Sequence, residues 1–220
     1  MSRHINTVLF DLDGTLLDTA PDLANALNAV LVQNDRTALP FEKIRPVVSH
    51  GGRALIELGF GLSPAHPEFE PLRKQLLDYY QAHIADETRL FPGMGEVLNN
   101  LENRGIHWGV VTNKPGWLTE PLMDALDLTR RAAGIVSGDT LEERKPHPAP
   151  LLHACDIIGS KPADCLYVGD AQRDIEAGHN AGMPTLVALF GYLMEQDRPE
   201  SWGATALIHS PEEILGWLGH

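Results

Sequence analysis

The sequence predicts an α/β fold in which a doubly wound parallel sheet carries a helical insert after its first strand. Short apolar runs of strand length alternate with segments of helical periodicity over most of the chain, which is typical of a parallel sheet wrapped by helices. Residues 17–89 instead show helical periodicity and no convincing strand. We therefore expect a core domain of residues 1–16 and 90–220 and a helical cap domain of residues 17–89.

The first strand is expected at residues 8–10, because consecutive apolar residues are typical of a strand buried on both faces. Asp11 and Asp13 follow directly, and in an extended backbone their side chains point the same way. Two carboxylates this close repel each other unless a cation lies between them or one keeps its proton. Gly14 and Thr15 then predict a sharp turn. The stretch predicts a site for a divalent metal and a phosphoryl group, although Asp and Gly are also common in surface turns.

The insert is expected to hold four helical segments. They cover residues 21–33, 42–48, 53–58 and 67–85. Thr19 can cap the first of them, and Pro46 is expected to bend or end the second. Residues 49–52, which include two glycines, are expected to form a loop.

The remainder of the chain returns to alternating strands and helices. Strands are expected at residues 108–112, 135–136, 165–168, 185–188 and 206–208. Helices are expected to end near residue 103, to cover residues 115–126, 148–158 and 173–180, and to begin again at Ser210. In such sheets, ligands bind at the carboxyl ends of the strands, near the point where the strand order reverses.

Polar residues suited to a phosphate site follow two further strands. Thr112 and Asn113 can hold phosphoryl oxygens, although either can also cap the next helix. Asp170 can reach a metal, whereas Asp174 lies near the positive end of a helix, and whether it contacts a metal is open. Lys145 lies in a loop stiffened by prolines, where a fixed ammonium can keep a carboxylate ionised and neutralise phosphoryl charge.

Other basic residues of these segments are interpreted as solvated. They are Lys114, Arg144 and His147.

The four segments resemble, in order along the chain, the four motifs of the haloacid dehalogenase superfamily. The first is the string Phe10-Asp11-Leu12-Asp13-Gly14-Thr15. The helical insert is similar to that family's first type of cap, and the implied core is a Rossmann-like sheet. Within the superfamily the chain looks most like the phosphoglycolate phosphatase group. The resemblance implies a Mg²⁺-dependent phosphatase that acts on a small-molecule phosphomonoester.

The resemblance also implies a role for each matched residue. Asp11 corresponds to the nucleophile that becomes an aspartyl-phosphate, and Asp13 to the acid that protonates the leaving group and then activates water. The carboxylates of Asp11 and Asp170 and the carbonyl oxygen of Asp13 correspond to Mg²⁺ ligands. The phosphate-binding positions correspond to Thr112, Asn113 and Lys145.

Two alternatives stay open: a sugar-phosphate mutase of the β-phosphoglucomutase kind, and a catalytically silent binding protein of the same fold. Substrate choice is expected in the cap, where His50 or Arg53 can meet a second anionic group; Arg53 can equally be solvated. Both 2-phosphoglycolate and N-acetylmuramic acid 6-phosphate carry a carboxylate. Residues 108–115 and 202–204 look similar to the phosphatases that act on the latter. The cap connections at residues 16–18 and 88–91 are expected to act as hinges.

Composition limits the partners. The formal net charge of −13 argues against nucleic acid and anionic membranes. No stretch approaches the roughly 18 apolar residues of a membrane span, and no signal peptide is recognisable. We expect a cytoplasmic monomer or homodimer in which Cys155 and Cys165 are reduced.

Overall fold

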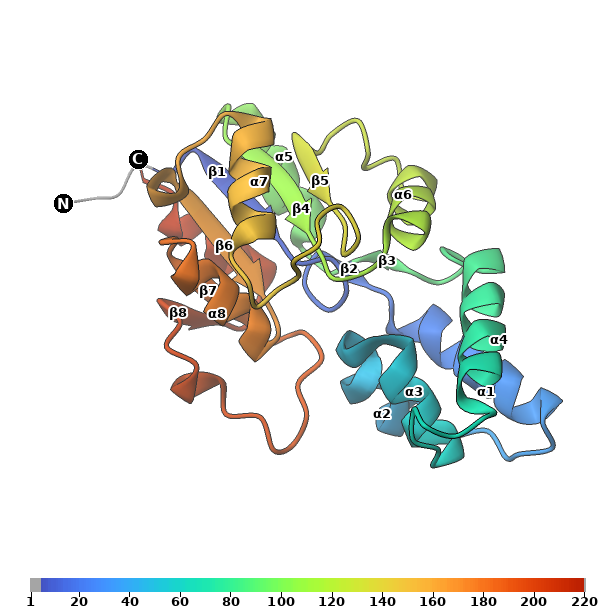
Figure 1. The fold of residues 1–220 in the computed structure, drawn as a ribbon. Helices are drawn as coiled ribbons and strands as arrows, with labels where there is room; N and C mark the ends of the chain where they lie inside the picture. Colours follow the sequence, from blue (N-terminus) through green and yellow to red (C-terminus); the bar gives the residue numbers. More distant parts are fainter. Residues whose placement is uncertain (1–4, 220) are drawn as a thin grey trace.

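The computed structural model describes residues 5–219 and confirms the doubly wound α/β fold (Figure 1). A six-stranded sheet has the order β5-β4-β1-β6-β7-β8, and every neighbouring pair is parallel. Its strands are β1 (Thr7–Phe10), β4 (His107–Val111), β5 (Gly134–Val136), β6 (Cys165–Gly169), β7 (Thr185–Ala188) and β8 (Ala206–Ile208). The chain moves from β1 to β4 and β5 on one side, then crosses to β6 on the other. The strand order therefore reverses around β1, where ligand sites of such sheets lie.

Helices cover both faces of the sheet. Alternate residues of β1 point to opposite faces, so they pack against different helices. Val8 and Phe10 pack in the core cluster that includes residues of α5 and α6, whereas Leu9 packs with residues of α7 and α8. In Figure 1, α7 and α8 lie on one face and α5 on the other. The bounds are α5 (Met94–Asn103), α6 (Gly116–Ala125), α7 (Ala149–Ile158) and α8 (Gln172–Asn180).

The insert forms a helical body beyond the carboxyl ends of the strands (Figure 1). It comprises α1 (Ala20–Gln33), α2 (Phe41–Ile44), the 3₁₀ helix η1 (Arg45–His50), α3 (Gly51–Phe60) and α4 (Phe69–Ala82). Helix α1 packs against both α3 and α4. The two connections between the insert and the sheet pair as an antiparallel ribbon of β2 (Leu17–Asp18) and β3 (Arg89–Leu90). We propose that residues 17–89 act as a cap domain on this ribbon.

Several local predictions were wrong. The β2–β3 ribbon was missed, because two residues per strand are too few to show a period. Residues 49–52 form no loop, since η1 runs to His50 and α3 begins at Gly51, where a φ of +74° redirects the chain. By contrast, the helix expected to begin at Ser210 is present, as the 3₁₀ helix η4 (Pro211–Trp217) with Ser210 at its N-cap. Two further 3₁₀ turns are η2 (Pro162–Asp164) and η3 (Pro199–Ser201).

The helix-breaking role of Pro46 is confirmed. The chain changes from α2 to the 3₁₀ helix η1 at Arg45, next to a residue that lacks a backbone N–H. Among residues 5–219, no helix combines the length and the apolar character needed to cross a bilayer.

A buried carboxylate, that of Asp22 in α1, ties the two cap connections together. It accepts hydrogen bonds from the backbone N–H of Glu87 at 3.0 Å, and from the N–H and hydroxyl of Thr88 at 2.8 and 2.7 Å. Asp22 is 1% exposed, so these bonds replace the water that its charge loses on burial. The return strand of the cap is thereby held against its first helix.

We predict that Asp22→Asn lowers the free energy of unfolding by about 1–3 kcal/mol, because the amide presents N–H groups where the backbone offers only donors. Urea denaturation followed by circular dichroism measures the loss. The control is Asp78→Asn, which removes an exposed pair with Lys74 and should change the value by less than about 0.5 kcal/mol. Equal effects of the two substitutions would contradict the assigned role of Asp22.

Candidate active site

The site lies where β1, β4 and β6 end side by side. The register pairs Phe10 of β1 with Val110 of β4 and with Val168 of β6. The residues that follow these strands therefore meet at one edge of the sheet, as the sequence predicted. Asp11, Thr112 and Asp170 are buried there, each with 3% or less of its surface exposed.

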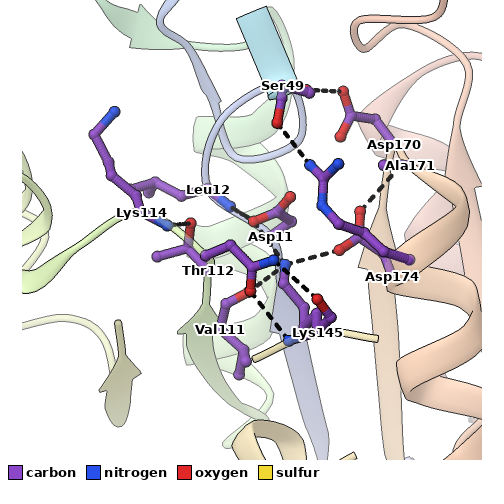
Figure 2. A network of polar contacts seen from close by, with 12 residues as sticks. Asp11, Leu12, Ser49, Val111, Thr112, Lys114, Lys145, Asp170, Ala171 and Asp174 are labelled. Atoms are coloured by element: carbon purple, nitrogen blue, oxygen red, sulfur yellow. Dashed lines mark hydrogen bonds and ion pairs between the residues drawn. The ribbon is translucent and has the colours of Figure 1, made fainter. Parts of the chain in front are cut away.

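Lys145 lies at the centre of the site, with its side chain fully buried. Its Nζ is 2.9 Å from Asp11 Oδ1 and 2.7 Å from Asp174 Oδ1 (Figure 2). It also donates to the carbonyl of Val111 and the hydroxyl of Tyr167. A buried ammonium is costly unless it is paired and hydrogen-bonded, and here both conditions are met. The predicted approach of this cation to the carboxylates is what the structure shows.

Asn113 holds Lys145 in place through its backbone. The Asn113 amide donates to the Lys145 carbonyl at 3.0 Å and accepts from the Lys145 N–H at 3.1 Å. The predicted phosphate contact of Asn113 stays a prediction, whereas its support of the lysine loop is visible. Thr112 Oγ1 accepts from the N–H of Lys114 at 3.1 Å, which shapes the turn after β4.

Three buried carboxylates converge on one point. Oxygen atoms of Asp11, Asp170 and Asp174 all lie within 4.8 Å of one another. Burial raises the pKa of Asp170 to about 8, and the charges of Asp11 and Asp174 add to the effect. Burial likewise raises the pKa of Asp11, against the opposing charge of Lys145. The charge of Arg173 opposes both shifts, yet the pKa values of Asp11 and Asp170 stay raised.

A divalent cation fits this cluster. Among the described residues, Asp170 Oδ1 is a buried atom without a hydrogen-bond partner, which is the arrangement expected of an oxygen that coordinates a metal ion. Carboxylate oxygens are the ligands that hard divalent cations prefer. The predicted ligands Asp11 and Asp170 both belong to the cluster; the Asp13 carbonyl stays a prediction.

Whether Asp174 contacts a metal was left open by the sequence. In the structure, both of its carboxylate oxygens have protein partners. Besides the ion pair of Oδ1 with Lys145, Asp174 Oδ2 accepts from the N–H of Ala171 at 3.0 Å. Although burial alone would raise it, Lys145 and Arg173 lower the pKa of Asp174. Asp174 therefore stays charged, holding Lys145 and the first turn of α8.

The interpretation of Lys114 as a solvated residue was wrong. Its side chain is 6% exposed, and Nζ lies 2.9 Å from Asp13 Oδ1 and 3.0 Å from the hydroxyl of Tyr80 in α4. Although burial alone would lower it, Asp13 and Tyr80 raise the pKa of Lys114. Asp13 Oδ1 also accepts from the hydroxyl of Thr19 at 2.6 Å. The expected helix cap by Thr19 is absent, because its hydroxyl is turned toward Asp13.

A cavity of about 800 Å³ opens between this site and the cap. Asp11, Asp13 and the two predicted cap residues His50 and Arg53 line it. The Arg53 side chain is 68% exposed and pairs with Glu57 at 3.0 Å. Partial burial lowers the pKa of His50, and Arg173 lowers it further, so His50 is neutral at pH 7 and offers hydrogen bonds rather than charge.

Two residues that contact Asp170, and a third that holds one of them, were not singled out from the sequence. The Ser49 hydroxyl and the N–H of Tyr192 both donate to Asp170 Oδ2, at 2.9 and 2.8 Å. Arg173 donates to the carbonyl of Ser49 at 2.9 Å. Nothing local marks them, since each acts on a residue supplied by another part of the fold.

Comparisons with known proteins agree with these motifs. A family model described as haloacid dehalogenase-like hydrolase matches residues 8–188. The chain is 42% identical over 215 residues to the N-acetylmuramic acid 6-phosphate phosphatase of Pseudomonas aeruginosa, covering 98% of this chain and 95% of that protein. It is 45% identical over 205 residues to the phosphoglycolate phosphatase of Xylella fastidiosa, covering 93% and 89%.

A similar solved structure is a crystal structure named as a predicted phosphoglycolate phosphatase from Haemophilus somnus. The TM-score is 0.85 at 28% identity, and the match covers 96% of this chain and 97% of the other.

We predict that Asp170→Asn stabilises the metal-free protein, and more so at pH 9 than at pH 6. The native pKa of about 8 lies above the ordinary 3.8, so the native state holds the Asp170 proton more tightly than the unfolded chain. The wild type therefore loses stability as the pH rises from about 4 to about 8, whereas the amide has no charge to bury. Thermal unfolding in chelator at the two pH values measures the difference.

The exposed carboxylate of Asp156 on α7 supplies the control, and Asp156→Asn should leave both unfolding midpoints nearly unchanged. A midpoint for Asp170→Asn that is no higher than that of the wild type at pH 9 would show that the cluster stores no repulsion.

Proposed function

The chain belongs to the haloacid dehalogenase-like hydrolase family and is a phosphatase, and we propose that it hydrolyses a carboxylated sugar phosphate through Asp11 with the help of Mg²⁺. The observation that carries the proposal is the large cavity with basic walls that opens directly onto Asp11. Asp11, Asp13 and Thr112 line it, and the buried ammonium of Lys145 contacts Asp11 from outside the lining.

In this proposal Asp11 attacks phosphorus with a carboxylate oxygen while the bond from phosphorus to the substrate oxygen breaks. Asp13 gives its proton to the departing alkoxide. Water then attacks the aspartyl-phosphate, Asp13 takes a proton from it, and inorganic phosphate leaves with Asp11 regenerated. Lys145 and Thr112 hold the phosphoryl oxygens, and Asn113 acts by holding Lys145. Bound by Asp11 and Asp170, Mg²⁺ supplies positive charge that offsets the charge of the phosphoryl group.

The basic side chains that line the cavity favour an anionic substrate. Against a net charge of −13, the cavity gathers six cationic side chains: Arg53, Arg73, Lys74, Lys114, Arg144 and Arg173. Arg53, Arg73 and Lys74 are held in exposed pairs with acids of their own helices, and such pairs are weak. A substrate carboxylate can therefore compete for them, and we assign that contact to Arg53.

The size of the cavity supports a sugar rather than a two-carbon acid. A volume near 800 Å³ lies within the range of about 300–1,000 Å³ that holds drug-sized ligands, and 2-phosphoglycolate would fill little of it. Trp117, on the first turn of α6, lines the cavity and is 42% exposed. A partly exposed indole at such a place offers a flat apolar surface to a sugar ring. Of the substrates named for the relatives, N-acetylmuramic acid 6-phosphate combines the ring, the carboxylate and the phosphate.

Other features support the remaining proposals. Cys155 and Cys165 are buried free thiols, in keeping with a reducing cytoplasm. The acidic surface supports a small-molecule substrate rather than nucleic acid or an anionic membrane. A monomer or homodimer stays our proposal for the assembly.

We predict Mg²⁺-dependent release of phosphate, abolished by chelation and by Asp11→Asn. The amide is a poor nucleophile of nearly the same shape, so kcat should fall by at least about a thousandfold while the fold is kept. A phosphate-release assay over a panel of phosphomonoesters, including both substrates named above, measures the activity. Asp156→Asn is the matched control and should retain full activity. Full turnover in chelator, or substantial activity of Asp11→Asn, would contradict the mechanism.

We predict that Trp117→Ala raises KM for N-acetylmuramic acid 6-phosphate by about two- to twelvefold, as expected for the loss of about 0.5–1.5 kcal/mol of ring stacking. The matched control is Trp217→Ala, since Trp217 is 40% exposed but lies in η4, away from the cavity lining. KM for 2-phosphoglycolate should scarcely change in either variant. Equal increases in KM for both substrates would contradict the proposed contact between Trp117 and the sugar ring.

The carboxylate contact is tested in the same assays by Arg53→Ala. It should raise KM for both carboxylated substrates by roughly tenfold or more and leave an aryl phosphate unaffected. A uniform loss on all three would place Arg53 in cap closure instead.

A further inference from the structure

The segment after β7 lies directly against the carboxylate cluster. We call residues 189–192 the β7 loop. The N–H of Tyr192 donates to Asp170 Oδ2 at 2.8 Å. A Cβ atom at Gly191 would overlap Asp170 and the carbonyl oxygen of Gly14, so only glycine allows this approach. The β7 loop therefore holds one oxygen of Asp170 through a backbone contact.

The other donor to the same oxygen comes from the cap. Ser49, in η1, donates from its hydroxyl to Asp170 Oδ2 at 2.9 Å. With both donors on Oδ2, the carboxylate plane is fixed, and Oδ1 is left free of protein donors among the described residues. Residues that hold a metal ligand in one orientation tune the affinity of the site.

Arg45, one turn earlier in η1, clamps the β7 loop itself. Its guanidinium donates to the carbonyls of Phe190 and Gly191, at 3.0 and 3.1 Å. It also lies over the Tyr192 ring, 4.9 Å from the ring centroid. Bidentate bonding combined with stacking is a contact that arginine makes and most residues cannot. The same cap helix thus reaches Asp170 by two routes, directly through Ser49 and indirectly through Arg45.

The hydroxyl of Tyr192 completes a link to the hinge of the cap. It donates to Asp18 Oδ1 at 2.7 Å and accepts from the N–H of Ala20 at 2.9 Å. Asp18 belongs to β2, and Ala20 begins α1, so these atoms lie in the first connection between sheet and cap. Tyr192 is 2% exposed and touches the hinge with one end and Asp170 with the other.

We propose that Arg45 and Tyr192 are positioning residues that make the orientation of Asp170, and hence the affinity for a divalent cation, depend on contact between the cap and the β7 loop. When the cap moves away, the bonds of Arg45 to the loop and of Ser49 to Asp170 are lost together. The carboxylate then keeps only the N–H of Tyr192 and is free to turn. The inference depends on the cation of the proposed function, but not on its substrate.

The test is titration of the metal-free protein with Mg²⁺ alone, without substrate, and isothermal titration calorimetry measures the Kd. For Arg45→Met we expect Kd to rise about tenfold, the low end of the range for residues that hold a metal ligand in place. Tyr192→Phe keeps the backbone N–H and loses the hinge bonds, and its Kd should rise severalfold. Arg45→Lys should recover part of the loss, because an ammonium can still donate to the two carbonyls.

Arg36→Met is the matched control. Arg36 donates to the carbonyl of Phe60 at 3.3 Å and lies 5.0 Å from the centroid of that ring, so it makes the same kinds of contact wholly inside the cap. Its Mg²⁺ affinity should equal that of the wild type.

Unchanged Kd values in Arg45→Met and Tyr192→Phe would overturn the inference and leave the proposed function intact. A wild type that binds no Mg²⁺ would overturn both. If circular dichroism shows that Arg45→Met does not fold, the other two variants decide. A weaker Mg²⁺ affinity in Tyr192→Phe, with a smaller loss in Arg45→Lys, supports the inference. Unchanged affinity in both variants overturns it.

Discussion

The site depends on the ion pairs made by Lys145. The ammonium lies between Asp11 and Asp174 in a fully buried position, and without it those carboxylates would face each other with no opposing charge between them. One ammonium does not balance the cluster, which explains why burial and mutual repulsion raise the pKa of Asp170. The fold thus brings three buried carboxylates together, and carboxylate oxygens are the ligands that a divalent cation favours.

The cap contributes chemistry as well as cover. Tyr80 of α4 accepts a hydrogen bond from Lys114, and Lys114 in turn contacts Asp13. On the other side of the site, Ser49 of η1 contacts Asp170. Both acids that flank Asp11 are therefore held by residues that depend on the cap. In our proposal, cap position and the geometry of the reactive groups are coupled, so substrate binding beneath the cap completes the site.

Charge distribution reconciles an acidic protein with an anionic substrate. A net charge of −13 would repel a phosphomonoester at long range. Six cationic side chains line the cavity against the three carboxylates of Asp11, Asp13 and Asp78, and three of the six are paired only with exposed acids. Recruitment thus depends on the cavity rather than on the whole surface.

The sequence by itself determined the sheet and most of the reactive floor of the site. Asp11, Asp170 and Thr112 each follow an apolar strand, and parallel strands bring such positions to one edge whatever the helices do. Only the tertiary structure decided the roles of Lys114 and Arg45. Lys114 meets Asp13 across 101 residues of chain, and Arg45 meets Gly191 across 146. A local pattern records the period of an element and the residues near its ends. It cannot record which distant side chain will reach them, because the packing of the cap on the sheet sets that distance.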